Sequence, residues 1–258
     1  MKKIPLIVKE ENSKKEIIKN IQRNTIMMNL TRSKTFEHQA IELGYEDLDT
    51  ETKKGGRSYL TPDGVSYPSI TTILGYFTKA SIIQWRNRVG EEEANRVTRH
   101  ACARGNALHY TVERYINNEE DFLQGETMPH ILQLVNAAKG VLDERLGKVI
   151  LQECPLYSDQ LQAAGRVDLI GEFDDTLSIV DFKTSKRVKS LEDIEDYFIQ
   201  ACTYAVMFEE RTGTPIDQLV ILMVVDGSSE PIVFKQNTDD WLEKMVNKIT
   251  SYHAQNPR

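Results

Sequence analysis

Residues 165–183, which read GRVDLIGEFDDTLSIVDFK, constrain the fold of this chain more than any other stretch. Apolar and β-branched residues on both sides of Asp174-Asp175 are typical of two strands joined by a tight turn. Three charged residues, Asp168, Asp181 and Lys183, lie inside these apolar runs. Burying charged side chains in a sheet costs free energy, so their presence here requires an explanation.

A two-residue turn at Asp174-Asp175 sets the pairing of the two strands. Phe173 then lies opposite Thr176, and counting outward places Asp168 opposite Asp181. Opposed side chains have Cβ atoms about 4.5–5.5 Å apart, and Lys183, two residues further on, shares their face. The apolar residues on the other face are Val167, Leu169, Phe173, Val180 and Phe182.

Two carboxylates at this spacing repel each other by about 3 kcal/mol at an effective dielectric near 20. Lys183 supplies one compensating charge, and a divalent cation supplies two. Carboxylate oxygens suit Mg²⁺ or Mn²⁺. The alternative is an ordinary ion-pair ladder on a solvated sheet face. Apolar pairs such as Leu169-Ile170 indicate central strands, where such charges more often belong to a functional site, but geometry alone leaves both interpretations open.

The preceding strand, predicted at residues 149–157, carries one further acid. If this strand turns back near residues 158–161 with an even loop, Glu153 falls opposite Arg166. Arg166 and Asp168 share a face, so Glu153 then points toward the same site. An odd loop turns it away.

Upstream of this strand, the pattern is mainly helical. Residues 57–67 read as a hairpin turning at Asp63-Gly64, and Pro68-Ser69 opens a helical stretch. Residues 81–118 are predicted to be helical, with breaks near Gly90 and Gly105. A further helix is predicted from Pro129, in its first turn, to Leu146, with Gly147 as its stop.

Downstream, a helix is expected over residues 191–211 and ends at Gly213. Strands follow at 219–225 and 232–235, and Thr238 is in position to cap a final helix. The predicted fold class is α/β, with a central mixed sheet of about five strands flanked by helices.

The chain is predicted to hold a single domain and an N-terminal extension. Residues 1–55 are polar and read as an arm, with a capping box at residues 13–16 before a short helix. Residues 56–258 form the single domain, with a helical part at 69–147 and the sheet with its flanking helices at 148–258.

Composition narrows the class of protein. The formal net charge is −7, unlike a protein that coats DNA, but an enzyme acting on DNA needs only a local basic groove. No apolar run is long enough to span a bilayer. The first residues are not a signal peptide, since their apolar stretch is short. Cys102, Cys154 and Cys202 are odd in number and far apart, which indicates a reducing, cytoplasmic compartment.

Several segments together resemble a known family. Asp168 followed by Asp181-Phe182-Lys183 resembles the Asp…(Asp/Glu)-x-Lys core of the PD-(D/E)XK nuclease superfamily. Residues 104–109 (RGNALH) resemble the RG-x-x-x-H helix of RecB-like nucleases. Residues 164–168 (AGRVD) resemble their second motif, and residues 200–204 (QACTY) their Q-x-x-x-Y helix. The literal Pro-Asp is absent, which is common in this superfamily.

Within that group, the chain is most similar to the mitochondrial genome maintenance exonuclease-like branch, which includes many phage proteins. The residues that carry this similarity are 64–74 (GVSYPSITTIL), Trp85-Arg86 and 90–95 (GEEEAN). The resemblance covers roughly residues 56 to 210 and implies the restriction-endonuclease-like fold. It also implies a phage origin, a host-cytoplasmic location, and a role in DNA replication, recombination or repair.

The resemblance implies a metal-dependent DNA exonuclease that acts on single strands or DNA ends with Mg²⁺ or Mn²⁺. The expected metal ligands are Asp168, Asp181, His109 and Glu153. Lys183 would orient the attacking water rather than act as base, because two carboxylates keep its pKa high. The fourth catalytic residue, Gln200, would position the nucleophile or the scissile strand.

DNA is the expected partner, together with replication or recombination proteins, and no membrane is expected. The predicted DNA-contacting residues are Arg104, Arg166, Lys186, Arg187 and Tyr204. Two alternatives remain: a structure-selective endonuclease, and a non-catalytic DNA-binding module that has the same fold. The iron–sulfur branch of RecB-like nucleases requires four clustered cysteines, so no such cluster is expected.

Overall fold

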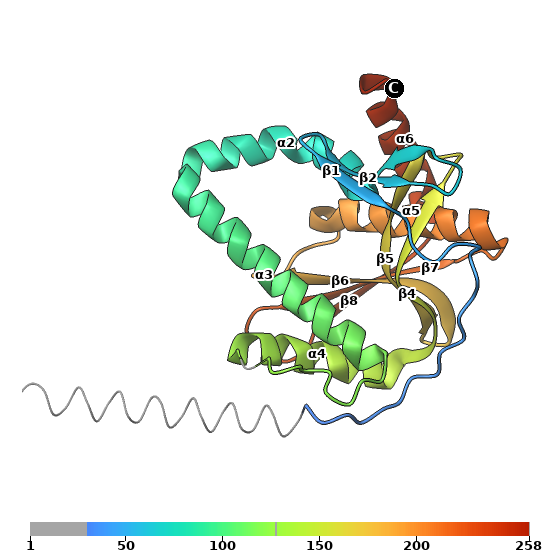
Figure 1. Ribbon diagram of the computed structural model, residues 1–258. Coiled ribbons are helices and arrows are strands. Elements are labelled where there is room, and N and C mark those ends of the chain that lie inside the picture. The colour runs from blue at the N-terminus through green and yellow to red at the C-terminus, as the bar shows by residue number, and fades with distance from the viewer. Residues whose placement is uncertain (1–29, 127, 258) are drawn as a thin grey trace, which may run out of the picture.

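The computed structural model describes residues 30–126 and 128–257 and places a five-stranded sheet at the centre of the molecule (Figure 1). The strands are β4 (Leu146–Ser158), β5 (Ala163–Phe173), β6 (Thr176–Ser185), β7 (Gln218–Val225) and β8 (Ile232–Asn237), in that spatial order. Only β6 and β7 pair in parallel; the other neighbours are antiparallel. This is the predicted mixed α/β sheet.

Strands β5 and β6 are joined by the predicted two-residue turn. Phe173 pairs with Thr176, and the register continues to Leu169 opposite Val180. Asp174 and Asp175 both have positive φ, of 53° and 60°, as a turn that matches the twist of a hairpin requires. The Asp174 carboxylate accepts hydrogen bonds from Arg145 Nε at 2.8 Å and Lys235 Nζ at 2.7 Å. These bonds fix the register on which the two acids depend.

Strand β4 turns back through a longer loop than predicted. Ser158 pairs with Ala163, so four residues form the loop, and Cys154 pairs with Val167. The loop is even, but the register is two residues away from the prediction: Glu153 lies across from Asp168 and not from Arg166, which pairs with Pro155. The extra loop residues account for the shift, while the parity keeps Glu153 on the expected face.

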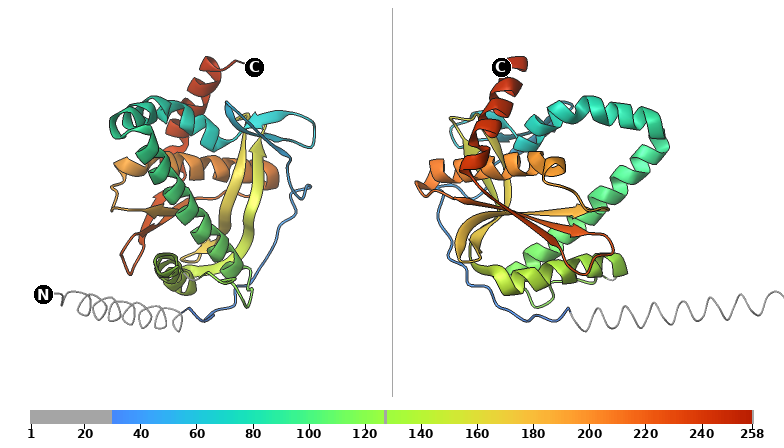
Figure 2. Two further views of the ribbon diagram at one scale, coloured as in Figure 1. Left: turned by 60° about the vertical axis from the view of Figure 1, so that its left-hand side comes forward. Right: turned by 180° about the vertical axis from the view of Figure 1, so that it is seen from behind.

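Helices cover both faces of the sheet (Figure 2). On one face lie α5 (Glu195–Thr212), α6 (Asp239–Gln255) and the first turns of α2 (Ile70–Val89); on the other lie α3 (Glu91–Ile116) and α4 (Pro129–Arg145). Successive sheet residues alternate between the two cores, so Ile170 packs under α5 while Leu169 faces α3 and α4. Burial on both faces confirms that β5, β6 and β7 are central strands.

The alternation holds for four of the five apolar residues assigned to the face opposite the acids. Leu169, Phe173, Val180 and Phe182 share the core beneath α3 and α4. Val167 is the exception: it packs in the core beneath α5. Val167 lies in the part of β5 that no longer pairs with β6, because that pairing ends at Leu169. This part of β5 is therefore free to turn away from the plane of β6.

Most predicted helix boundaries are confirmed. Ser69 caps α2 by accepting a 3.0 Å hydrogen bond from Thr72 N–H, and Gly90, with φ of 87°, separates α2 from α3. The predicted break at Gly105 is wrong, because α3 continues through it. Helix α4 begins at Pro129 as expected but runs directly into β4 at Leu146 without a stop at Gly147.

The ends of α5 and α6 differ slightly from the prediction. A short 3₁₀ turn, Glu192–Ile194, precedes α5, which ends at Gly213 in the left-handed conformation. Thr238 lies at the start of α6, but its hydroxyl donates to the carbonyl of Ile216 at 2.6 Å and does not cap the helix.

A second, three-stranded sheet lies beside the first turn of α2. It consists of β1 (Thr50–Lys53), β2 (Gly56–Leu60) and β3 (Ser66–Pro68), all antiparallel. The hairpin predicted over residues 57–67 is therefore present, while strand β1 was not predicted. A bridge from Ser69, directly after β3, to Ala164 attaches this small sheet to the start of β5.

Residues 30–49 run along the body without regular structure and are anchored at several points. Arg32 donates to the carbonyl of Tyr115 at 2.9 Å, and backbone hydrogen bonds join Glu37 and Gln39 to Val149. Leu30 and Phe36 are buried against α3 and α4. The capping box at residues 13–16 lies outside the described residues. Across residues 30–126 and 128–257, none of the helices has the length and apolarity that crossing a bilayer requires.

Replacing Asp174 with Asn tests the turn. Arg145 and Lys235 hold the pKa of Asp174 well below its usual range, so its ionised form stabilises the fold above the ordinary aspartate pKa of about 3.9. We expect Asp174→Asn to lower the free energy of unfolding by about 1 kcal/mol at pH 7. The difference should shrink as the pH falls below about 4, because the unfolded chain then takes up a proton on Asp174, and it should vanish once the folded carboxylate is protonated as well. Urea unfolding measures both.

The matched control is Asp175→Asn, in the same turn and with the same backbone conformation but with an exposed side chain. It should change stability little at any pH. Equal losses in the two variants would show that the ion pairs of Asp174 do not hold the turn.

Candidate active site

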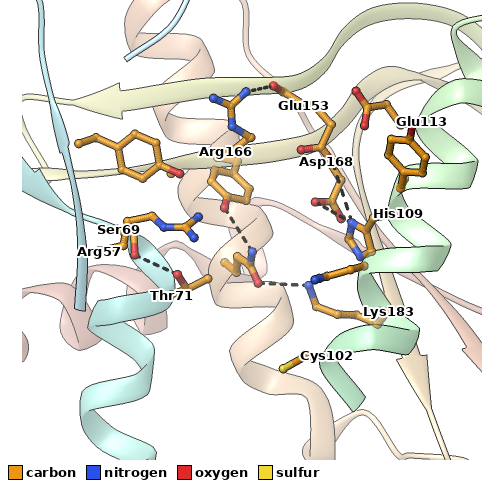
Figure 3. A pocket seen from close by; sticks show the side chains of 17 residues that line it. Arg57, Ser69, Thr71, Cys102, His109, Glu113, Glu153, Arg166, Asp168 and Lys183 are labelled. Carbon is orange, nitrogen blue, oxygen red and sulfur yellow. Dashed lines mark hydrogen bonds and ion pairs between the residues drawn. The ribbon is translucent and has the colours of Figure 1, made fainter. Parts of the chain in front are cut away.

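A pocket of about 540 Å³ opens where β4, β5 and β6 meet α3 and the small sheet (Figure 3). Its lining includes five of the predicted catalytic and metal-binding residues: His109, Glu153, Asp168, Lys183 and Gln200. They come from α3, β4, β5, β6 and α5 respectively. Sequence segments more than 90 residues apart thus converge on one cavity.

Asp168 lies where the β5–β6 ladder ends. The last paired residues are Leu169 and Val180, so the Asp168–Asp181 pair, although opposed on the same register, is not part of the ladder. Instead the Asp168 carboxylate accepts the backbone N–H of Phe182 at 2.9 Å. Burial raises the pKa of Asp168, an effect that His109 and Lys183 partly offset.

Asp181 lies beneath the pocket, only 1% exposed. Its oxygens accept no well-formed hydrogen bond from any residue that the structure describes, but the Lys183 ammonium forms an ion pair with one of them. Burial raises the pKa of Asp181 to about 6 in spite of that cation. For Lys183, the carboxylates outweigh burial and raise the pKa of the ammonium, so it is charged at neutral pH.

A polar chain continues from Lys183 toward α5. The ammonium donates to Oε1 of Gln200 at 3.3 Å, and the Gln200 amide donates to the Tyr204 hydroxyl at 3.2 Å. Gln200 and Tyr204 lie one turn apart on α5. Both are largely buried, so the chain holds the Lys183 ammonium in one place.

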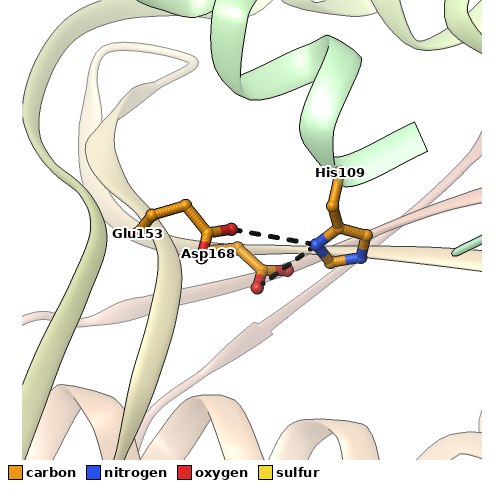
Figure 4. A group of neighbouring side chains, drawn as sticks. All are labelled: His109, Glu153 and Asp168. Carbon is orange, nitrogen blue, oxygen red and sulfur yellow. Dashed lines mark ion pairs between the residues drawn. The ribbon is translucent and has the colours of Figure 1, made fainter. Parts of the chain in front are cut away.

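His109 connects α3 to both carboxylates (Figure 4). Its Nε2 donates to the carbonyl of Phe182 at 2.8 Å, and its Nδ1 lies 3.5 Å from Asp168 Oδ1 and 4.0 Å from Glu153 Oε1. Burial opposes the imidazolium, but the surrounding carboxylates raise the pKa of His109 to about 9. The bond to Phe182 keeps the proton on Nε2, so that loss of the other proton leaves Nδ1 able to bind a cation.

The backbone of Glu153 is unusual for a strand. Its φ is +45°, a left-handed conformation that costs a non-glycine residue free energy and that clusters at functional sites. The Arg166 guanidinium donates to the Glu153 carbonyl and also to Asp47 at 2.6 Å. Arg166 therefore holds the main chain that aims the Glu153 carboxylate at His109 and Asp168.

These groups suit a divalent metal ion. One ligand atom each from His109, Glu153 and Asp168 lie within 4.8 Å of one another. Carboxylate oxygens and a neutral imidazole are suitable ligands for Mg²⁺- or Mn²⁺-type ions. The buried Asp181 oxygens, which have no hydrogen-bond donor among the described residues and only the Lys183 cation beside them, add an electrostatic demand for positive charge. Asp181 is outside the three-residue group, so its role as a ligand stays a prediction.

The residues predicted to contact DNA are more scattered. Arg104 is buried and donates to Asp226 at 2.7 Å, and it does not line the pocket. Lys186 and Arg187 are exposed just after β6. Arg166 is at the pocket with its guanidinium engaged, and Tyr204 is buried with only its edge on the pocket wall.

Sequence reasoning missed residues on the wall formed by the small sheet and α2. The pocket-lining residues concerned are Arg57, Ser69 and Thr71. A signal for the first was available, because a turn at Asp63-Gly64 returns β2 toward the start of α2. The sequence does not reveal the bridge between Ser69 and Ala164, which places this hairpin against β5.

Comparison with known proteins is consistent with this site. The family model for the PD-(D/E)XK nuclease superfamily matches residues 83–256. Among curated proteins, mitochondrial genome maintenance exonuclease 1 of Mus musculus is 25% identical over 175 residues, covering 63% of this chain and 51% of that protein. The chain spans about half the length of this relative.

Removing one ligand tests the metal site directly. We expect Asp168→Asn to weaken Mn²⁺ binding by at least about tenfold, because a neutral amide replaces a charged oxygen ligand. Isothermal titration calorimetry on the full chain measures the affinity. Asp63→Asn, at the exposed hairpin tip, should leave it unchanged. Equal affinity in both variants would contradict a site at Asp168.

Proposed function

This chain belongs to the PD-(D/E)XK nuclease superfamily, and we propose that it is a Mg²⁺- or Mn²⁺-dependent exonuclease acting on single-stranded DNA or DNA ends. The observation that carries this proposal is the complete set of Asp168, Asp181 and Lys183, joined in one pocket region by His109 and Glu153. Non-catalytic proteins on the same fold have no need to keep all of these charges together at such an energetic cost.

The proposed chemistry is hydrolysis of a phosphodiester bond. A bound divalent ion polarises the phosphate and lowers the pKa of a water molecule. His109, Glu153 and Asp168 would hold that ion, with Asp181 below them contributing negative charge. The backbone of Phe182 fixes two of these groups in place. Its N–H donates to Asp168, and its carbonyl accepts from His109 Nε2.

Lys183 has an orienting role in this proposal. Because its pKa is raised, the ammonium remains charged and donates hydrogen bonds instead of removing a proton. Gln200 accepts a hydrogen bond from the ammonium and Asp181 pairs with it, which leaves one N–H to donate to the attacking water or a phosphate oxygen. Lys183 is therefore expected to stabilise the charge that develops in the transition state.

The finer parts of the proposal rest on similarity. The name of the mouse relative includes an exonuclease activity, which favours the exonuclease over a structure-selective endonuclease. We assign residues 56–258 to the nuclease domain and residues 1–55 to an extension. We place the protein in phage DNA replication, recombination or repair in the host cytoplasm, with DNA as the substrate and no iron–sulfur cluster.

A panel of labelled substrates tests the activity. Wild-type protein with Mg²⁺ or Mn²⁺ should degrade linear single-stranded DNA and leave circular single strands intact. Asp181→Asn and Lys183→Ala should each reduce the rate by at least about 100-fold, since each removes a preorganised charge. Lys148→Ala, on the outer strand β4 and outside the pocket lining, should retain full activity.

The panel also separates the alternatives. Cleavage of the circles would identify an endonuclease. Undiminished hydrolysis by both site variants would remove this pocket from the reaction, and DNA binding without any hydrolysis would favour the non-catalytic module.

A further inference from the structure

The basic side chains that line the pocket differ in whether they are already neutralised. Lys183 forms an ion pair with Asp181, and the His109 ring lies against Asp168 and Glu153. Arg166 is bound to Asp47. Arg57 lines the same pocket and is exposed, yet within the described part of the chain its guanidinium has no carboxylate partner and no hydrogen-bond acceptor.

The backbone of Arg57 is held firmly although its side chain is free. Its N–H donates to the Thr72 hydroxyl at 2.9 Å, and its carbonyl accepts from that hydroxyl at 3.0 Å and from Ser69 N–H at 2.8 Å. Three hydrogen bonds thus join this position of β2 to the start of α2. The base of the Arg57 side chain is preorganised, and little backbone entropy is lost when the guanidinium binds a ligand.

Gly56 makes this attachment possible. A Cβ atom at this position would overlap the Thr72 side chain, and the φ of +129° is one that other residues rarely adopt. The glycine lets β2 lie directly on the first turn of α2. Close backbone packing therefore sets the position of Arg57 at the pocket. An arginine on a flexible surface loop would not be held in this way.

Figure 3 shows where Arg57 points. Its side chain extends into the pocket from the wall next to Ser69 and Thr71, opposite His109 and the carboxylates. Three acids, Glu113, Glu153 and Asp168, also line the pocket. The other basic groups there, Lys183, Arg166 and His109, already lie against carboxylates. A nucleic-acid strand entering the pocket meets these negative charges, so its phosphates require a cation that no protein carboxylate has neutralised.

We infer that Arg57 binds a phosphate of the substrate strand next to the scissile one, and so positions the strand across the pocket. Guanidinium forms two parallel hydrogen bonds with a phosphate, which fixes orientation as well as supplying charge. This inference rests on the proposed nuclease function. It adds a substrate-binding residue on the small sheet, outside the acidic and lysine residues of the superfamily core.

The test compares Arg57→Gln with Lys53→Gln. Lys53 is exposed on β1 of the same small sheet and lies outside the pocket lining, so both variants lose one positive charge from the same sheet. Binding of a fluorescent single-stranded oligonucleotide is measured by anisotropy at several salt concentrations, with Ca²⁺ in place of Mg²⁺. Thermal melting checks that each variant is folded.

Arg57→Gln should weaken binding about tenfold, the loss expected for one charge-assisted hydrogen-bonded contact. The slope of log affinity against log salt should fall by about 0.7, because one phosphate contact is lost. Arg57→Lys should keep the salt slope while binding less tightly. Lys53→Gln should resemble wild type in affinity. Equal affinities and slopes for Arg57→Gln and Lys53→Gln would overturn the inference.

Steady-state hydrolysis by the same proteins separates this inference from the proposed function. For Arg57→Gln we expect KM to rise about tenfold with kcat changed less than about threefold, as loss of uniform substrate binding produces. If wild type hydrolyses DNA but Arg57→Gln has unchanged KM, only the role of Arg57 fails. If wild type hydrolyses no DNA, the proposed function fails and the inference with it.

Discussion

The buried ion pair between Asp181 and Lys183 is the interaction on which the rest of this structure depends. A carboxylate that is 1% exposed in a central strand is costly, and burial accordingly raises the pKa of Asp181. Lys183 offsets part of it and is itself held by Gln200. A purely structural sheet would be more stable with apolar residues at these positions. The retained charges therefore indicate chemistry.

The packing of the helices leaves a pocket above these charged groups. Two apolar cores cover the faces of the sheet, one beneath α5 and α6 and the other beneath α3 and α4. Pairing of β5 with β6 ends at Leu169 and Val180, so Asp168 leaves the ladder and turns toward the pocket. Helix α3 brings His109 to the same point, and the left-handed backbone of Glu153 brings the third acid. Rigid packing on both sides keeps these groups close together.

The sequence predicts the parts of this arrangement that depend on local rules. A two-residue turn fixes the Asp168–Asp181 register, because side chains alternate and turn length sets the pairing. Glu153 was placed on the correct face because only the parity of its loop mattered. Its partner was wrong, since four residues form the loop. The position of Arg57 depends on a hairpin packing against a helix, and no periodicity in the sequence reports that contact. Arg104 was expected at the DNA and instead lies buried against Asp226, a tertiary contact that charge alone does not reveal.

We propose that His109, Glu153 and Asp168 form the ligand set of a divalent cation. Anomalous diffraction from crystals of the full chain soaked in Mn²⁺ tests this most directly, because the peak locates the ion independently of activity. We expect a strong anomalous peak within bonding distance, about 2.0–2.3 Å, of oxygen atoms of Asp168 and Glu153 and of His109 Nδ1. Crystals that show Mn²⁺ elsewhere on the protein, with these three side chains still paired only with one another, would contradict it.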